Sequence, residues 1–129
     1  SINLRDSSDE VRKKVAKMYT DPTRIHATDP GHIENNPVFT YHDAFNPDKR
    51  EVANLKRRYK AGKVGDIEVK EKLAIAINEF LDPIRLRRKK LEQEPYKILR
   101  ILEAGTTKGR EVAKETLSKV KQAMKISYW

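Results

Sequence analysis

The sequence contains no cysteine. Disulfide bonds, thiolate metal sites and cysteine nucleophiles are therefore excluded for these residues. Glycine is also scarce, and the five glycines do not approach either of the glycine-rich fingerprints that bind nucleotide phosphates. The chain has neither a run of about 18 apolar residues nor an opening leader in which charge precedes an apolar stretch. We therefore expect a cytoplasmic protein with no membrane partner.

Histidine is rare as well, and its spacing argues against a metal site. The three histidines, His26, His32 and His42, are six and ten residues apart, whereas ligands on one helical face need a spacing of about three or four. We expect them to lie in loops or on the surface. No serine stands in a nucleophile motif, and carboxylate pairs such as Glu68 and Glu71 are expected on exposed helix faces. The sequence thus predicts no metal site and no catalytic residue.

Positive charge is abundant and unevenly placed. The net charge is +9, and residues 49–63 hold seven positive side chains against one negative. The segments on either side of this stretch, residues 1–48 and 64–81, are slightly acidic. Basic charge that is concentrated in this way predicts a polyanionic partner, most often nucleic acid.

Helix caps and apolar spacing predict helices in the first half of the chain, and no segment alternates as a β-strand does. Ser7 and Glu10 have the spacing of a capping box. Pro37 and Pro47 each follow an asparagine, which is typical of a capped helix with proline in its first turn. The predicted helices cover 8–19, 37–45 and 47–61, and the turn-rich segment 20–36 is expected to be a loop.

Further helices are predicted in the second half. One begins near Asp66 and meets Pro83, where we expect either a kink or a fresh helix that ends near residue 93. Two more begin near Pro95 and Thr107. Their apolar side chains follow helical spacing and are expected to be buried: Ile98, Leu99, Leu102, Val112, Leu117, Val120 and Met124. The prediction is one all-α domain over 1–129, a bundle of five to six helices.

The strongest functional signal in the residues themselves is the stretch KREVANLKRRYKAGK, which begins at Lys49. On a helix, its cations form a basic ridge along one flank of an apolar stripe. Lys49, Lys56, Lys60 and Lys63 fall on this flank, and Arg50 and Arg57 extend it. Such a ridge is a candidate RNA-binding surface, and it is equally typical of a solvated helix face.

A second basic stretch, RLRRKK, brings Arg85 and Arg88 to one face of a helix. Arg88 and Glu92 are four residues apart, so local ion pairs on a solvated face explain this stretch as well as RNA binding does. Either ridge alone leaves both interpretations open. Together with the uneven charge, the two ridges favour binding.

Three longer motifs carry a resemblance to a known family. They are DPGHIENNPVF at 29–39, YKAGKVGDIEVK at 59–70 and EFLDPIRLRR at 79–88. With the segments around them, which span nearly all of the chain, they resemble the C-terminal, anticodon-binding portion of bacterial-type tryptophanyl-tRNA synthetase. The KMSKS signature and the nucleotide-binding sheet of that family are not in this sequence.

The resemblance implies a helical domain that binds the anticodon stem-loop of the tRNA for tryptophan and does not itself catalyse. Residues 1–6 would correspond to the connection that follows the KMSKS loop of the catalytic domain. ATP and magnesium would serve the full-length enzyme, and this chain would need no cofactor. The full-length enzyme would be a homodimer, whereas this chain is compatible with a monomer.

The resemblance also implies site residues. Arg24 would contact an anticodon base or phosphate from the segment after the first helix, and Lys70 would contact the anticodon from the start of its own helix. Arg24 is also compatible with a purely structural ion pair to Asp21 or Asp29. Lys70 could pair with Asp66 in the same way. The complete set of expected RNA-binding residues is Arg24, Lys56, Arg57, Lys60, Lys63, Lys70, Arg85 and Arg88.

A function of another class is a helical protein-interaction module. In that interpretation, Val52, Leu55, Tyr59 and Trp129 would contact a partner protein. Salt-sensitive binding of an anticodon stem-loop would favour RNA, whereas tight binding of an apolar partner without it would favour the module.

Overall fold

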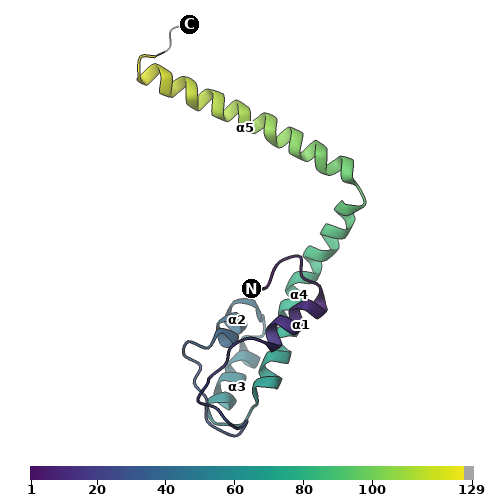
Figure 1. The fold of residues 1–129 in the computed structure, drawn as a ribbon, viewed down its shortest axis with the longest axis vertical. Helices are drawn as coiled ribbons and strands as arrows, with labels where there is room; N and C mark the ends of the chain where they lie inside the picture. The colour runs from purple at the N-terminus through teal and green to yellow at the C-terminus, as the bar shows by residue number, and fades with distance from the viewer. Residues whose placement is uncertain (127–129) are drawn as a thin grey trace. The chain divides into compact units, whose positions relative to one another are not determined.

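The computed structural model describes residues 1–126, and every regular element in that range is an α-helix. The chain divides into two compact units, residues 1–86 and residues from 87 onward. The helices, labelled in Figure 1, are α1 (Ser8–Ala16), α2 (Pro37–Phe45), α3 (Lys49–Lys60), α4 (Asp66–Glu92) and α5 (Pro95–Ala123). The predicted all-α class with five to six helices is confirmed. None of the helices in the described range is long and apolar enough to span a membrane.

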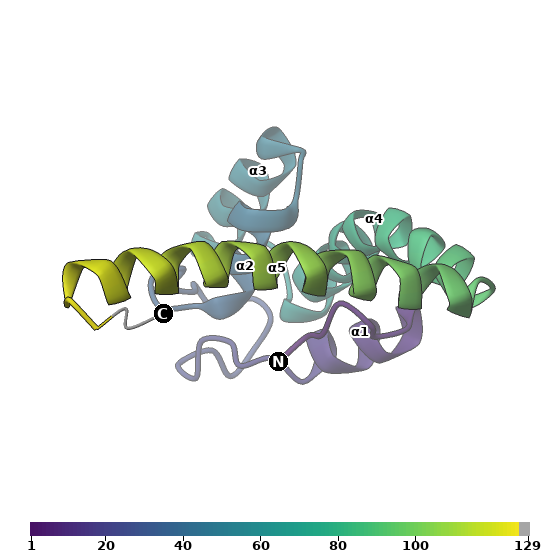
Figure 2. The same ribbon diagram turned by 90° about the horizontal axis from the view of Figure 1, so that it is seen from above.

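The core of the first unit is made of side chains spaced one helical turn apart. Val11 and Val15 supply it from α1, and Leu55 and Tyr59 from α3. The row from α4 is Val69, Leu73, Ile77 and Leu81. None of these residues is more than 3% exposed, and each such side chain stabilises the fold by about 1.5–3 kcal/mol relative to exposure. Figure 2 shows α1 and α3 on opposite sides of this unit, with α2 and the start of α4 between them.

Two of the local predictions match the structure. The segment 20–36 contains no helix, and α2 has the predicted bounds. The side chain of Asn36 caps α2 by accepting a hydrogen bond from the Val38 amide at 3.1 Å, and Pro37 occupies the first turn. Both features depend only on neighbouring residues, which is why the sequence predicts them well.

Helix α1 has the predicted start but ends three residues early. Ser7 and Glu10 form the expected capping box. The helix ends at Ala16, however, and the Ala16 carbonyl accepts a hydrogen bond from Lys70 Nζ at 3.0 Å. The prediction that this helix continues to residue 19 is wrong, and a distant side chain satisfies one of the carbonyls that the helix end leaves without an amide donor.

Two starting points in the middle of the chain also differ from the predictions. Helix α3 begins at Lys49, since Asp48 caps it by accepting from the amides of Arg50 and Glu51 at 3.0 and 2.9 Å. Helix α4 runs through Pro83 without a fresh start. Asp82 pairs with Arg85 at 2.8 Å instead of capping a new helix. Of the two alternatives at Pro83, the fresh helix is wrong.

The second unit departs most from the predictions. Helix α5 is continuous, and the Thr107 hydroxyl donates to the Glu103 carbonyl at 3.0 Å inside the helix instead of capping a new one. No residue of α5 is buried. The side chains predicted to be buried are 38–62% exposed: Ile98, Leu99, Leu102, Val112, Leu117, Val120 and Met124. Helical spacing identifies an apolar face, but it does not supply a surface to cover that face.

Candidate nucleic-acid interface

Arg24 lies in the interior of the first unit. Its Nε donates to the Asp29 carbonyl at 2.9 Å, and its Nη2 donates to the carbonyls of Ala27 and Val64 at 2.6 and 2.8 Å. The side chain is 1% exposed. Arg24 therefore fastens the loop 20–36 to the segment before α4, and the structure leaves almost none of its guanidinium on the surface.

A second set of contacts joins Arg24 to the helices. Its guanidinium carbon lies 4.1 Å from the centroid of the Tyr59 ring, and the Tyr59 hydroxyl donates to Asp66 Oδ1 at 2.8 Å. Arg24 Nη1 is 3.5 Å from the same carboxylate oxygen. Burial raises the pKa of the Tyr59 hydroxyl. Gly31 is required beside them, because a Cβ there would overlap the Tyr59 ring. The acidic partner of Arg24 is thus Asp66, and not Asp21 or Asp29 as an ion pair.

The other carboxylate of the loop, Asp21, is also structural. Its Oδ1 accepts from the Thr23 hydroxyl at 2.6 Å and from the Thr23 amide at 2.9 Å. Its Oδ2 accepts from the His32 amide at 2.6 Å and lies 2.8 Å from His32 Nδ1. These hydrogen bonds, led by the one from the Thr23 hydroxyl, hold the pKa of Asp21 far below its usual range. Asp21 therefore shapes the loop as a permanent anion.

The histidines do not form a metal site in the described range. No group of three or more possible ligands occurs among residues 1–126. His26 and His32 lie in the loop, as predicted. His42 does not, because it is fully buried in α2, where its Nε2 donates to the Val69 carbonyl at 2.9 Å and its Nδ1 lies 3.3 Å from Asn46 Nδ2. Burial lowers the pKa of His42, so this side chain is a neutral core residue.

The basic ridge on α3 is partly neutralised by carboxylates from other segments. Lys56 pairs with Asp43 at 2.7 Å, and Lys60 pairs with Glu34 at 3.1 Å. Arg57 and Lys63 are exposed and make no ion pair within residues 1–126. Some cations of this ridge therefore pair internally, and others face solvent.

The two arginines of the second predicted ridge have different partners. Arg85 donates to the Asp6 carbonyl at 3.0 Å, to Asn78 Oδ1 at 2.8 Å and to Asp82 at 2.8 Å. It thereby holds the N-terminal segment against α4. Arg88 belongs to the second unit, where it is 54% exposed and pairs with Glu92 at 2.6 Å, as the spacing of four predicts.

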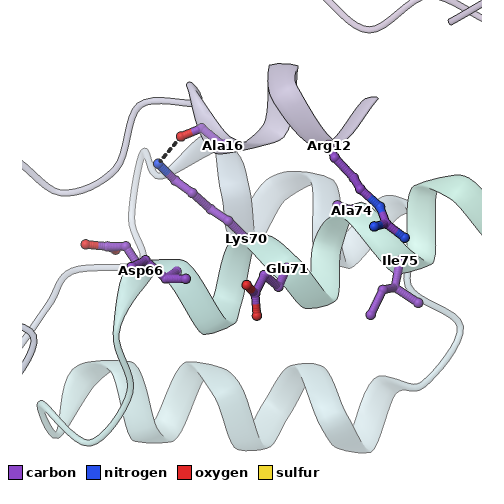
Figure 3. A pocket seen from close by; sticks show the side chains of 8 residues that line it. Arg12, Ala16, Asp66, Lys70, Glu71, Ala74 and Ile75 are labelled. Carbon is purple, nitrogen blue, oxygen red and sulfur yellow. Dashed lines mark hydrogen bonds between the residues drawn. The ribbon is translucent and has the colours of Figure 1, made fainter. Parts of the chain in front are cut away.

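Lys70 lies in a groove between α1 and α4 of the first unit. The groove has a volume of about 490 Å³, within the range of roughly 300–1,000 Å³ typical of ligand sites. Its lining residues are Arg12, Ala16, Asp66, Ile67, Lys70, Glu71, Ala74 and Ile75. Figure 3 shows Lys70 reaching from α4 to the Ala16 carbonyl, with Arg12 extending from α1 toward Ala74 and Ile75. The bond to Ala16 replaces the predicted alternative, a pair with Asp66.

The sequence predictions missed Arg12 and Glu71, which line this groove with Lys70. One signal was present: Ile67 and Ile75 are apolar, yet they stand outside the four-residue row that begins at Val69. They are 76% and 53% exposed. Apolar residues that do not fit the core row of a helix are candidates for a binding surface.

Three of the four residues expected to serve a protein-interaction module are buried in the core. Val52, Leu55 and Tyr59 are 1–3% exposed, because the stripe that they form on α3 faces the core. Trp129 lies outside the described residues. The alternative function therefore has no support from these side chains.

Comparisons with known proteins all point to one family. Residues 1–82 match the family described as tRNA synthetases class I (W and Y). A tryptophan–tRNA ligase of Treponema pallidum is 54% identical over 98% of this chain and 38% of its own length. One of Borreliella burgdorferi is 45% identical over 98% of this chain and 36% of its own length.

A solved structure extends this similarity to the fold. The tryptophanyl-tRNA synthetase of Campylobacter jejuni superposes with a TM-score of 0.76 at 27% identity, over 96% of this chain and 39% of that one. The chain thus spans well under half the length of the relatives that it matches. The matched family region, 1–82, nearly coincides with the first compact unit, 1–86.

Proposed function

This chain belongs to the class I tRNA synthetases of the tryptophan and tyrosine type, and from that premise we propose that it binds the anticodon stem-loop of the tRNA for tryptophan. The choice of tryptophan is supported by relatives named tryptophan–tRNA ligase that match 98% of the chain. The chain itself binds and does not catalyse, since its sequence has no nucleotide-binding fingerprint.

One observation carries the proposal: a groove of about 490 Å³ has the cations Arg12 and Lys70 on its two walls. An anticodon loop presents unpaired bases between closely spaced phosphates, so a protein needs a recess for a base and positive charge beside it. Lys70 uses one of its three N–H donors on the Ala16 carbonyl. The remaining two are available for a phosphate or a base.

The cations of α3 contribute electrostatic affinity in this proposal. Arg57 and Lys63 are exposed without an internal ion pair in the described range, so they meet phosphates directly. Lys56 and Lys60 pair with partly exposed carboxylates, and an exposed pair of this kind is worth only about 0–1 kcal/mol. A phosphate can therefore replace the carboxylate at little cost. Arg88 adds charge from the second unit.

Two of the arginines are assigned positioning roles instead of RNA contacts. Arg24 is buried and joins the loop 20–36 to Tyr59 and to Asp66, the first residue of α4. Lys70 stands one turn further along the same helix, so Arg24 acts on RNA through Lys70. Arg85 acts similarly by holding Asp6 and the N-terminal segment on α4.

The test is a titration of the purified chain with a hairpin of the tryptophan anticodon arm, followed by fluorescence anisotropy at several salt concentrations. If about four phosphates are neutralised, the logarithm of affinity falls with the logarithm of salt concentration with a slope of roughly −3. A hairpin of the same stem with an unrelated loop measures non-specific binding. If the folded chain binds neither hairpin at low salt, the proposal is wrong.

The proposal extends to a longer protein that contains this chain. The relative from Treponema pallidum is about 2.6 times as long as this chain, a ratio that follows from the 38% of its length that the match covers. We propose that the whole protein attaches tryptophan to its tRNA and acts as a homodimer. ATP and magnesium then bind outside these 129 residues, and pyrophosphate exchange by this chain alone should be undetectable.

A further inference from the structure

We infer that the groove between α1 and α4 receives a single unpaired anticodon base and that the Glu71 carboxylate reads the exocyclic amino group of that base. The inference rests on the proposed function and adds a reading residue to it. Glu71 was expected only to be part of a solvated helix face, so this role is new to the residue.

Glu71 stands between two exposed isoleucines on one row of α4. Ile67, Glu71 and Ile75 are four residues apart, so their side chains follow one another along the helix surface. The two isoleucines are 76% and 53% exposed and contribute nothing to the core. Bases held outside a stack pack their faces on apolar side chains and present their edges to polar groups. A carboxylate flanked by apolar side chains suits that arrangement.

Small residues line the groove on both helices. Ala16 of α1 and Ala74 of α4 line it, together with the stem of Lys70. Arg12 extends from α1 on the side of Ile75 (Figure 3), and a guanidinium plane can stack on a base. The groove therefore offers apolar contact from α4, a stacking cation from α1 and room between them.

The free acceptor in this groove is Glu71. Within residues 1–126 its carboxylate makes no hydrogen bond and no ion pair, and it is exposed. The other carboxylate that lines the groove, Asp66, already accepts from the Tyr59 hydroxyl. Arg12 and Lys70 line the same groove, and their charges oppose the repulsion between Glu71 and the phosphates that flank a bound base.

An ionised carboxylate can only accept hydrogen bonds, so it selects bases that carry an amino donor. Cytosine presents N4 and adenine presents N6 as donors, whereas uracil presents the O4 acceptor at the corresponding position. The tryptophan codon UGG pairs with the anticodon CCA, in which all three bases carry an exocyclic amine. Glu71 therefore favours the cognate anticodon and opposes loops in which uracil replaces cytosine.

The experiment uses the whole chain and a set of hairpins that share one stem. The cognate CCA loop is compared with loops that carry a single cytosine-to-uracil change at each position. At one position, the unsubstituted chain should bind cytosine about tenfold more tightly than uracil, within the discrimination that one good base contact provides. Glu71→Gln should reduce this preference to about twofold or less, since an amide also donates to uracil O4.

Glu79→Gln is the matched control, because Glu79 is exposed on the same helix and does not line the groove. It should keep the tenfold preference. A preference that is unchanged in Glu71→Gln overturns the inference while hairpin binding upholds the proposed function. Absence of binding to every hairpin at low salt overturns both.

A second copy of the chain is the competing occupant of the groove. Sedimentation of the chain with and without Ile75→Glu tests it. If the unsubstituted chain is a dimer that this change dissociates, and hairpin affinity is unchanged, the groove is a protein interface and the inference is wrong. A monomer whose hairpin affinity falls with Ile75→Glu supports the base-binding groove.

Discussion

The guanidinium carbon of Arg24 lies 4.1 Å from the centroid of the Tyr59 ring, in a place where neither side chain is more than 1% exposed. A cation on an aromatic face in a desolvated site is worth about 2 kcal/mol. Here it is combined with three hydrogen bonds from Arg24 to main-chain carbonyls. This pair ties the irregular loop 20–36 to α3 and to the start of α4, and hence sets the position of Lys70.

Arg24→Ala should lower the free energy of unfolding by about 3–5 kcal/mol, since it removes hydrogen bonds to three main-chain carbonyls and the buried cationic partner of Asp66. Arg24→Lys should also destabilise the fold, because an ammonium group cannot reproduce the fork of the guanidinium. Urea denaturation measures both. Arg57→Ala, at an exposed site, should change the value by no more than about 0.5 kcal/mol. An unaltered urea midpoint in Arg24→Ala, with RNA binding lost, would instead make Arg24 a contact residue.

Gly62→Ala should destabilise the first unit by about 2 kcal/mol or more. Gly62 has a φ of +65°, and a Cβ there would collide with the Thr28 carbonyl. Gly65→Ala is the matched control, because its Cβ would meet only the Ala27 side chain at 3.6 Å. It should stabilise the chain by about 0.4–1 kcal/mol. The two melting temperatures should therefore move in opposite directions, and a shift of both in the same direction would contradict the role of the loop.

The stability of the chain should fall as pH falls below about 6.5, because of His42. Burial holds the pKa of His42 below the ordinary histidine value of about 6.5. Between the two values the unfolded chain binds a proton that the folded chain excludes, so unfolding becomes more favourable as the pH decreases. The contribution of His42 to the stability of the fold is fully present above the pKa that His42 has in the unfolded chain. It is lost as the pH falls toward the lower pKa of the folded chain.

The free energy of unfolding measured from pH 7.5 to pH 5 checks this expectation. The carboxylates with lowered pKa values, such as Asp21 and Glu51, lose their contributions only at a more acidic pH, near or below about 4. His42→Gln should remove the dependence in the neutral range, whereas His26→Gln, in the exposed loop, should keep it. A flat profile for the unsubstituted chain would show that His42 is not the titrating group.

Lys70→Ala and Lys63→Ala should weaken hairpin binding in different ways. Lys63 meets phosphate, so its loss should lower affinity for all hairpins about equally and make the salt slope shallower by about 0.7. Lys70 lines the groove, so its loss should lower affinity for the cognate loop more than for an unrelated loop. Anisotropy titrations at two salt concentrations distinguish the two effects. Equal losses on both loops for Lys70→Ala would place Lys70 among the phosphate contacts.

Features that depend on neighbouring residues were predictable. The capping box of Ser7 and Glu10, the cap of α2 at Asn36 and the all-α class all follow from spacing along a few residues. Predictions failed where a local signal had two possible outcomes: Thr107 can cap a helix or bond to a carbonyl one turn back, and it does the latter.

The sequence by itself determined the all-α class of this protein, the cap of α2, the excess of positive charge and the loop that separates α1 from α2, because these depend on local caps, turn residues and composition. The tertiary structure alone decided which cations are available. Arg24 reaches Val64 across 40 positions, Lys60 reaches Glu34 across 26, and Lys70 reaches Ala16 across 54. Such pairs form only when packing brings distant segments together, and no local pattern specifies which ones will meet.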